Sequence, residues 1–283
     1  MSEVRAKKSL GQHFLTDQQI ARDIVAALRF DDLQTTSEQG DVQGGKAQVL
    51  EVGPGMGVLT QYLLQREDID LRAVEIDRES VDYLYLHFPS IGGKLIQGDF
   101  LRLPLERVFP SASGVDADAD VPKSPIHLIG NFPYNISSQI FFKVIDNRAR
   151  IPQVVCMIQK EVAQRIAEKP GTKTYGILSV LLQAWYDIEY LFTVGEGAFN
   201  PPPKVKSAVI RLTRNGRESL GCDEALFKTV VKTAFGQRRK TLRNSLKTLF
   251  PEAMPTDDPI FDLRPERLGV EDFVRLTRML EQN

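Results

Sequence analysis

A ten-residue segment around which the rest of the chain is organised reads Gly130-Asn131-Phe132-Pro133-Tyr134-Asn135-Ile136-Ser137-Ser138-Gln139. It follows the apolar run 126–129, which predicts a short buried strand, and it leads into a helical pattern that begins at Ser137. Residues 131–134 are therefore expected on the turn at the carboxyl end of a strand. In open α/β sheets, ligands bind at this end of the strands.

Three residues of this turn suit an exocyclic amine on a flat base. The amide oxygen of Asn131 can accept one proton from such an amine. Pro133 fixes its own φ and leaves neighbouring carbonyls free to accept the second proton. Tyr134 offers a face on which a base can stack. Taken alone, the four residues equally suit a turn ended by proline beside a core tyrosine, so the surrounding pattern has to decide.

The composition is that of an ordinary globular protein. The chain has 283 residues, of which 42% are hydrophobic and 26% charged, which suits one large domain with a small one or a single α/β domain. It contains no run of eighteen apolar residues, and its N-terminus has no apolar signal segment. The two cysteines and three histidines are scattered, which predicts neither a disulfide framework nor a metal site. We expect a cytoplasmic protein without a metal.

Strand and helix patterns alternate from residue 17 to residue 213. This order predicts an α/β fold with a Rossmann-like, mostly parallel sheet that is covered on both faces. An antiparallel pair, 188–194 and 207–213, is expected to close the sheet. Two polar segments, 34–46 and 111–124, are expected to be surface loops. The other strands are expected at 49–52, 71–77, 94–97, 126–129 and 154–158, and helices at 79–87, 160–167 and 177–185.

Only helical patterns follow residue 214, so we expect one domain at 1–214 and a small all-helical domain at 215–283. Seven cations and no acid lie between Ala225 and Phe250, in a chain whose net charge is −1. This local excess favours contact with the phosphates of a nucleic acid over a merely solvated helix face. The RNA-binding candidates, expected on a basic helix, are Arg238, Arg239, Lys240 and Arg243.

Three strand ends together predict a nucleoside pocket. Gly53 and Gly55 lie in the loop Gly53-Pro54-Gly55-Met56-Gly57, where glycines allow the backbone to approach a ligand. Glu75 ends the next strand, where a carboxylate can bond ribose hydroxyls, and Asp99 follows the third strand and can accept from an adenine amine. Such a pocket suits NAD or S-adenosylmethionine. Residues 131–134 favour S-adenosylmethionine, because a methyltransferase needs only an oriented nucleophile.

A second aromatic residue, Phe199, begins the proline-rich segment Phe199-Asn200-Pro201-Pro202-Pro203-Lys204-Val205. It could close on the face of a flipped base opposite Tyr134. A rigid connector with a core phenylalanine is an equally good interpretation of the segment in isolation.

Ordered motifs across nearly the whole chain resemble the ribosomal RNA adenine N6-dimethyltransferase family, and within it the bacterial enzymes of small-subunit (16S) RNA. The motifs are Gln12-His13-Phe14-Leu15, 51–55, 74–77, Gly98-Asp99, 130–138, 159–162, 199–209 and 237–246. The resemblance implies a class I methyltransferase fold, S-adenosyl-L-methionine as cofactor, and dimethylation of two adjacent adenosines in a loop near the 3′ end of that RNA. It also implies an immature ribosomal subunit as partner, with no membrane, and we expect a monomer. The expected cofactor contacts are His13, Leu15, Gly53, Gly55, Glu75, Asp99 and Asn131.

The expected reaction is direct in-line transfer. Asn131 and a backbone carbonyl near Pro133 would accept the amino protons, while Tyr134 and Phe199 would sandwich the base. Two alternatives stay open: a large-subunit RNA methylase of the macrolide-resistance type, and an assembly or transcription factor that keeps the fold without catalysis. The motifs 199–209 and 237–246 favour the small-subunit enzymes, and intact Asn131 and Tyr134 argue against a factor without catalysis. Phe132 stands where family members often have leucine, and the segments 34–46 and 111–124 are longer than usual.

Overall fold

A computed structural model describes residues 4, 6–30, 45–109, 124–250 and 257–282. The expected surface loops 34–46 and 111–124 fall almost wholly outside these ranges. The chain divides into two compact units, one of residues 1–160 with 189–213 and one of residues 161–188 with 214–283. The second unit thus contains 161–188 besides the C-terminal helices. A functional boundary between 214 and 215 stays a prediction.

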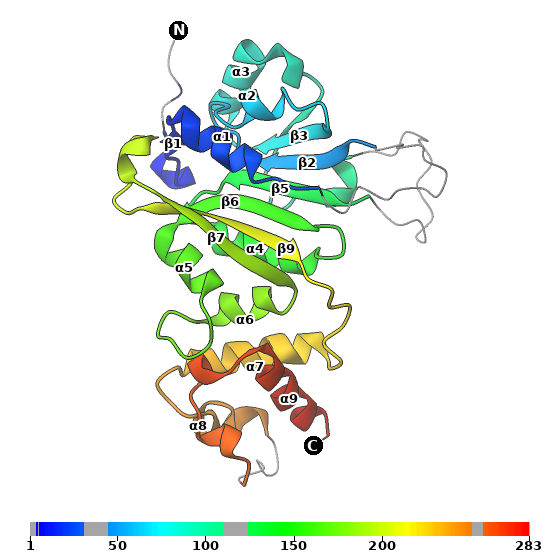
Figure 1. Ribbon diagram of the computed structural model, residues 1–283, viewed down its shortest axis with the longest axis vertical. Helices are drawn as coiled ribbons and strands as arrows, with labels where there is room; N and C mark the ends of the chain where they lie inside the picture. Colours follow the sequence, from blue (N-terminus) through cyan, green and yellow to red (C-terminus); the bar gives the residue numbers. More distant parts are fainter. Residues whose placement is uncertain (1–3, 5, 31–44, 110–123, 251–256, 283) are drawn as a thin grey trace. The chain divides into compact units, whose positions relative to one another are not determined.

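A seven-stranded sheet forms the centre of the first unit, in the order β4-β3-β2-β5-β6-β9-β7 (Figure 1). Strands β4 to β6 in this order are parallel neighbours, and β9 runs antiparallel to β6. The predicted Rossmann-like sheet with an antiparallel closing strand is therefore confirmed. The strands are β2 (Ala47–Val52), β3 (Ile69–Glu75), β4 (Leu95–Gln97), β5 (Ile126–Asn131), β6 (Gln153–Gln159), β7 (Tyr186–Val194) and β9 (Ser207–Arg214).

The register of the parallel strands decides what meets at their carboxyl ends. Val52 on β2 aligns with Val74 on β3, and Glu75 aligns with Gln97 on β4. On the other side of β2, Glu51 aligns with Ile129 on β5. The loops that follow β2, β3, β4 and β5 therefore all leave the sheet at the same edge.

The helices of the first unit are α1 (Gln18–Ala26), α2 (Thr60–Leu63), α3 (Arg78–His87) and α4 (Ser137–Asp146). Helix α1 starts after Asp17, whose carboxylate accepts from the amides of Gln19 and Ile20. One buried cluster joins α1 and α2 to β2, β3, β5 and β6, and another packs α3 on β3 and β4. The described 3₁₀ turns of this unit are η1 (Lys8–Leu10), η3 (Pro89–Ile91), η4 (Leu105–Arg107) and η5 (Glu196–Ala198).

A second, two-stranded sheet has no counterpart in the sequence prediction. Strand β1 (Phe14–Leu15) pairs antiparallel with β8 (Phe199–Asn200), so that Leu15 lies opposite Phe199. Each strand has two residues, which is too short to show any periodicity. The pair joins the segment before α1 to the proline-rich segment after β7.

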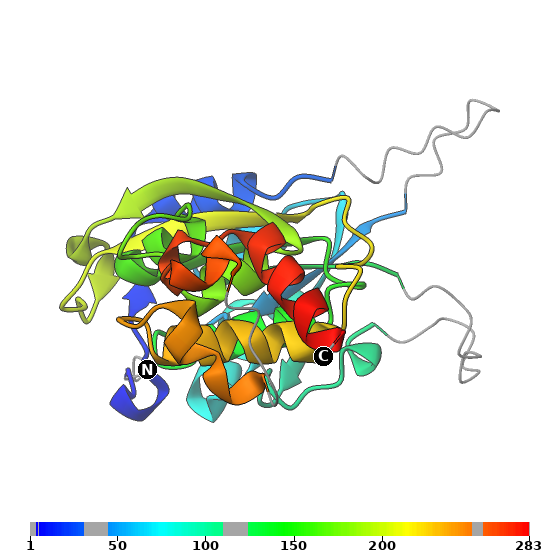
Figure 2. The ribbon, with the colours of Figure 1, turned by 90° about the horizontal axis from the view of Figure 1, so that it is seen from below.

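The second unit is helical, with α5 (Lys160–Ala167), α6 (Ile177–Gln183), α7 (Glu224–Gly236), α8 (Leu242–Ser245) and α9 (Val270–Glu281). It also has the turns η6 (Lys247–Leu249), η7 (Pro259–Asp262) and η8 (Pro265–Arg267). Figures 1 and 2 show α9 crossing α7 at an angle, and α6, α7 and α9 all contact one another. No strand begins after Arg214 in the described part of the chain, which confirms the predicted helical C-terminal region. None of the described helices has the length and apolar character needed to cross a lipid bilayer.

Candidate functional site

A cavity of about 240 Å³ lies at the carboxyl edge of the sheet in the first unit. Its wall combines the ends of four strands with the segment before α1, although these pieces are far apart in the sequence. Most of the lining comes from residues 9–15, 51–56, 74–76, 98–101 and 131–136. The strand ends that the sequence marked as a nucleoside pocket therefore meet around one space.

All three glycines of the loop after β2 have positive φ, 69° at Gly53, 55° at Gly55 and 78° at Gly57. A Cβ on Gly55 would come 3.0 Å from the ring of Phe14, so a side chain there would have to displace this ring besides adopting a strained φ. A Cβ on Gly53 would meet no atom within 4 Å. The backbone at Gly53 is therefore open on a side that borders the cavity, where a ligand can approach it.

Glu75 fastens the glycine loop to the end of β3. Its side chain is almost fully buried, and its two oxygens accept hydrogen bonds from the backbone N–H groups of Gly55 (3.0 Å) and Asp77 (2.9 Å). Burial raises the pKa of Glu75, although these backbone hydrogen bonds pull it in the opposite direction. The carboxyl group thus orders two loops that line the cavity or adjoin it.

A second buried carboxyl, Glu51, lines the same cavity and is 1% exposed. It accepts a hydrogen bond from Thr60 Oγ1 at 2.7 Å. Burial, reinforced by the nearby charge of Glu75, raises the pKa of Glu51 to about 8, against the pull of the Thr60 hydrogen bond. Near neutral pH the folded protein therefore carries a proton on Glu51 that the unfolded chain has largely lost.

This proton predicts a pH-dependent stability that Glu51→Gln should remove. Since the folded pKa lies above the unfolded one, the contribution of Glu51 is complete below pH 4.5 and is lost as the pH rises through about 8. Glutamine keeps an oxygen for Thr60 but cannot ionise. The melting temperature of the wild type should therefore fall below that of Glu51→Gln as the pH rises across this window. If the melting temperatures of the wild type and Glu51→Gln instead changed in parallel with pH, Glu51 would be ionised in the folded protein.

Asn131 is held by the segment before α1. Its Nδ2 donates to the carbonyl of His13 at 3.0 Å, which directs the amide oxygen the opposite way. The ring of Tyr134 stacks on that of His13 with centroids 5.4 Å apart, and the Tyr134 hydroxyl shares a 2.5 Å hydrogen bond with Ser207 Oγ. Burial raises the pKa of Tyr134, so its phenol stays neutral. His13 in turn donates through Nδ1 to the carbonyl of Pro201 at 2.9 Å.

Asp99 lies on a turn that α4 holds in place. Its Oδ1 accepts from the backbone N–H of Leu101 at 2.9 Å. Lys143 Nζ donates to the carbonyls of Leu101 (3.2 Å) and Leu103 (2.6 Å). The turn after β4 is therefore fixed before any ligand binds.

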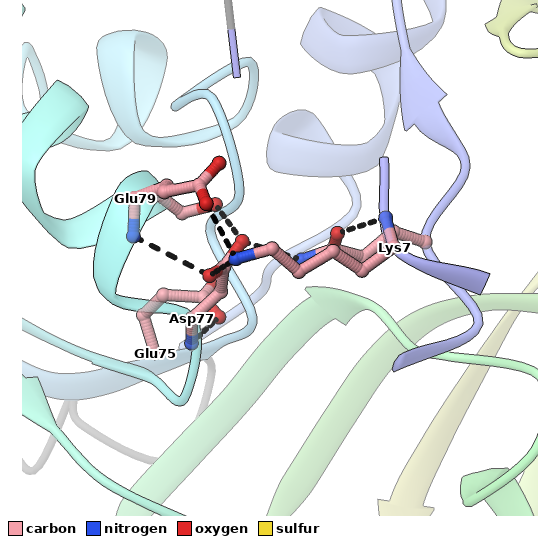
Figure 3. Close-up of polar contacts among 6 residues, drawn as sticks. Lys7, Glu75, Asp77 and Glu79 are labelled. Carbon is pink, nitrogen blue, oxygen red and sulfur yellow. Dashed lines mark hydrogen bonds and ion pairs between the residues drawn. The ribbon is translucent and has the colours of Figure 1, made fainter. Parts of the chain in front are cut away.

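Sequence reasoning missed several residues at the cavity. Ile76 lines the cavity next to Glu75, and its apolar side chain is 52% exposed. Its position directly after a predicted strand was the signal that could have identified it. Gln12 and Phe14 belong to the motif 12–15, of which the family resemblance singled out only His13 and Leu15 as cofactor contacts. Close to it, Lys7 contacts Asp77 and Glu79 (Figure 3).

The candidate residues fall into three groups. Those that line the cavity are His13, Leu15, Gly53, Gly55, Glu75, Asp99, Asn131, Pro133 and Tyr134. Phe199 is 4% exposed in the core of the first unit and does not line the cavity. The four basic candidates lie in the second unit. All of these roles stay predictions.

The basic candidates do not lie on one helix, contrary to the sequence prediction. Helix α7 ends at Gly236, so Arg238, Arg239 and Lys240 lie on the following turn. Arg238 donates to the carbonyls of Thr172 and Lys173, while Arg239 and Lys240 are exposed. On α8, Arg243 pairs with Asp262 at 2.8 Å. The helical pattern failed here because the first four residues after Gly236 form a turn.

Comparisons with known proteins agree with this geometry. A family model described as "Ribosomal RNA adenine dimethylase" matches residues 3–258. "Ribosomal RNA small subunit methyltransferase A" of Parabacteroides distasonis is 56% identical over all of this chain and 97% of its own length. The protein of that name in Porphyromonas gingivalis is 53% identical over the whole of both chains.

Solved structures with the same fold are more distant in sequence. A dimethyladenosine transferase from Plasmodium falciparum has a TM-score of 0.71 at 23% identity, covering 95% of this chain and 98% of its own. The 23S rRNA methyltransferase ErmE has a TM-score of 0.61 at 22% identity, covering 95% of this chain and all of its own. These two likenesses support the fold, and the family match over residues 3–258 gives the membership: the chain belongs to the ribosomal RNA adenine dimethylase family.

Proposed function

We propose that this enzyme transfers methyl groups from S-adenosylmethionine to N6 of two adjacent adenosines near the 3′ end of small-subunit (16S) ribosomal RNA, two on each. The observation that carries the proposal is the oriented amide of Asn131 at the end of β5, in a cavity that also holds Glu75 and Asp99. The relatives at 53–56% identity carry the name of a small-subunit methyltransferase, which supports the choice of RNA.

The cavity suits S-adenosylmethionine by its chemistry. Gly53 leaves backbone open to a ligand, Glu75 supplies a carboxyl for ribose hydroxyls, and Asp99 supplies an acceptor for the adenine amine. The exposed Ile76 offers an apolar surface next to the ribose site. When bound, the cofactor supplies an electrophilic methyl group, so the protein needs to provide orientation and no activated nucleophile of its own.

In the proposed mechanism the protein holds the amine of the target adenine. The oxygen of Asn131 accepts one amino proton, because Nδ2 is engaged with His13. The carbonyl of Pro133 accepts from the N–H of Ile136 at 3.2 Å and has a second lone pair for the other proton. Tyr134 presents its ring, which Ser207 and His13 hold in position. Orientation of this kind can supply several kcal/mol of barrier reduction.

Phe199 can be the second stacking face only after its side chain moves. Its backbone pairs with Leu15, and its side chain is packed in the core. To sandwich a base, this side chain has to leave the core when RNA binds. Phe199 is therefore proposed to stack on the base only in the RNA-bound state.

A methylation assay tests the function directly. The purified chain, S-adenosylmethionine with a tritiated methyl group and immature small subunits should give incorporation, and primer extension should stop at two adjacent adenosines near the 3′ end. Incorporation into large-subunit RNA instead would favour the macrolide-resistance type of methylase. Cofactor binding without incorporation into either RNA would favour an assembly factor. Action on an immature subunit, as a monomer in the cytoplasm, is part of the same proposal.

The exposed cations after α7 should contribute to RNA affinity by neutralising phosphates. In Arg239→Gln/Lys240→Gln, the slope of log affinity against log salt should flatten by about 0.7–0.9 for each phosphate that the variant no longer neutralises. Cofactor affinity should not change, because both residues lie outside the unit that contains the cavity. Filter binding across a salt series measures the slope, with Lys46→Gln/Lys94→Gln as the charge-matched control. An unchanged slope would place RNA docking elsewhere.

A further inference from the structure

The segment that precedes β1 is fastened at Lys7. The ammonium group of Lys7 lies 2.5 Å from Asp77 Oδ1 and 3.1 Å from Glu79 Oε1, with the carboxylates converging on it (Figure 3). Asp77 raises the pKa of Lys7 through their hydrogen bond, and Glu79 acts in the same direction. Lys7 is 70 residues from Asp77 in the sequence, so this contact closes a long loop.

Residues 7–12 form a compact turn with both ends on the same carboxylate. The backbone N–H groups of Leu10 (3.0 Å) and Gln12 (3.4 Å) donate to the carbonyl of Lys7. Gln12 Oε1 accepts from the N–H of Lys7 at 2.8 Å, and Gln12 Nε2 donates to Asp77 Oδ2 at 3.3 Å. The two oxygens of Asp77 thus hold the beginning and the end of the turn.

Asp77 is a fixed anchor. Its side chain is 2% exposed, and it caps α3 by accepting from the N–H of Glu79 and the hydroxyl of Ser80, each at 3.3 Å. Its own N–H donates to Glu75. Burial by itself would raise the pKa of Asp77, but the hydrogen bonds from Lys7 and Gln12 outweigh it and lower the pKa. Asp77 therefore stays ionised and connects the turn 7–12 to the carboxyl that orders the glycine loop.

The turn continues directly into the cavity wall. Residues 9–15 line the cavity, and His13 within them orients Asn131. If the turn were loose, a ligand would have to order this wall when it binds, at a cost in affinity. If the turn is already fastened, that cost is avoided, and loosening the turn should let a bound ligand leave faster.

We propose that Lys7 and Asp77 are positioning residues that clasp the turn 7–12 beside the cofactor cavity and thereby set the rate at which S-adenosylmethionine and its product leave. The identity of the ligand rests on the proposed function. Lys7 is the side of the clasp that can be changed safely, because its side chain is 36% exposed, whereas Asp77 also caps α3.

The test measures binding of S-adenosylhomocysteine by calorimetry and its dissociation by stopped flow. Lys7→Met should raise both the dissociation constant and the dissociation rate about 3- to 10-fold, as expected when a charge-assisted hydrogen bond is removed. Lys7→Arg, which keeps the cation, should stay within about 2-fold of the wild type. Lys46→Met, the same change at an exposed lysine that does not line the cavity, should have no effect. The melting temperature of Lys7→Met should fall below those of the other three proteins, because the buried Asp77 loses a charged partner, so binding is measured well below every melting transition.

Hydrogen exchange of the ligand-free protein gives a readout independent of activity. The amides of Leu10 and Gln12 should exchange faster in Lys7→Met than in the wild type, because their acceptor is the carbonyl of Lys7. Wild-type binding rates together with unchanged exchange in Lys7→Met would overturn the clasp and leave the proposed function intact. Failure of the wild type to bind S-adenosylhomocysteine would overturn both.

Discussion

Replacing Asn131 by alanine is expected to lower methyl transfer to small-subunit RNA by on the order of 100-fold, the size of effect seen when one oriented polar group at a reacting centre is removed. The hydrogen bond from Nδ2 to the His13 carbonyl fixes the amide, so its oxygen is already directed when the adenine arrives. Alanine removes that oxygen and leaves the amine free to rotate. RNA affinity should stay nearly unchanged, because Asn131 contacts only the reacting amine, whereas Tyr134 stacks on the base and other residues contact the phosphates.

Asn131→Asp is the matched control for this prediction. The carboxylate keeps an oxygen acceptor in the same place, but it cannot donate to the carbonyl of His13. We therefore expect Asn131→Asp to retain more turnover than Asn131→Ala, together with weaker cofactor binding because the wall at His13 loses its partner. Single-turnover tritium transfer and filter binding on the same samples separate the two effects. Near-normal dimethylation by Asn131→Ala would refute the role assigned to this amide.

The parts of the site predicted from the residue pattern itself lie at strand ends, whereas His13 and Leu15 came from the family resemblance. Gly53, Glu75, Asp99 and Asn131 each follow an apolar run long enough to be recognised as a strand, and parallel strands carry their carboxyl ends to one edge. The meeting of these residues around one cavity therefore follows from the order of the elements alone. Helix spans such as 79–87 and 160–167 were predictable because their apolar residues recur with a clear helical period.

The parts that could not be predicted depend on contacts without a local pattern. Strands β1 and β8 have two residues each, and their pairing joins positions about 185 apart, so no periodicity announces it. The ion pair of Lys7 with Asp77 could not be predicted, because the chain has many charged residues and no local pattern shows which of them pair. The burial of Phe199 follows from the β1–β8 pairing. The sequence alone therefore could not decide whether Phe199 packs in the core or stacks on the target adenine.

Replacing Glu75 by alanine is expected to weaken S-adenosylmethionine binding by about 1–3 kcal/mol, or roughly 5- to 150-fold in the dissociation constant. The structure gives two reasons besides the missing partner for ribose hydroxyls. The backbone N–H groups of Gly55 and Asp77 both donate to this carboxyl and would lose their acceptor. The glycine loop and the anchor of the N-terminal turn would then loosen together.

Glu75→Gln separates the two contributions of this carboxyl. The single amide oxygen of glutamine can accept from the N–H of either Gly55 or Asp77, but not from both in the native geometry. We therefore expect an affinity between those of the wild type and the alanine variant. Glu67→Ala, an exposed acid that does not line the cavity, should bind like the wild type. Calorimetric titration with S-adenosylmethionine measures all three. Wild-type affinity in Glu75→Ala would remove this residue from the site, whereas equal losses in the alanine and glutamine variants would mean that the second oxygen is indispensable.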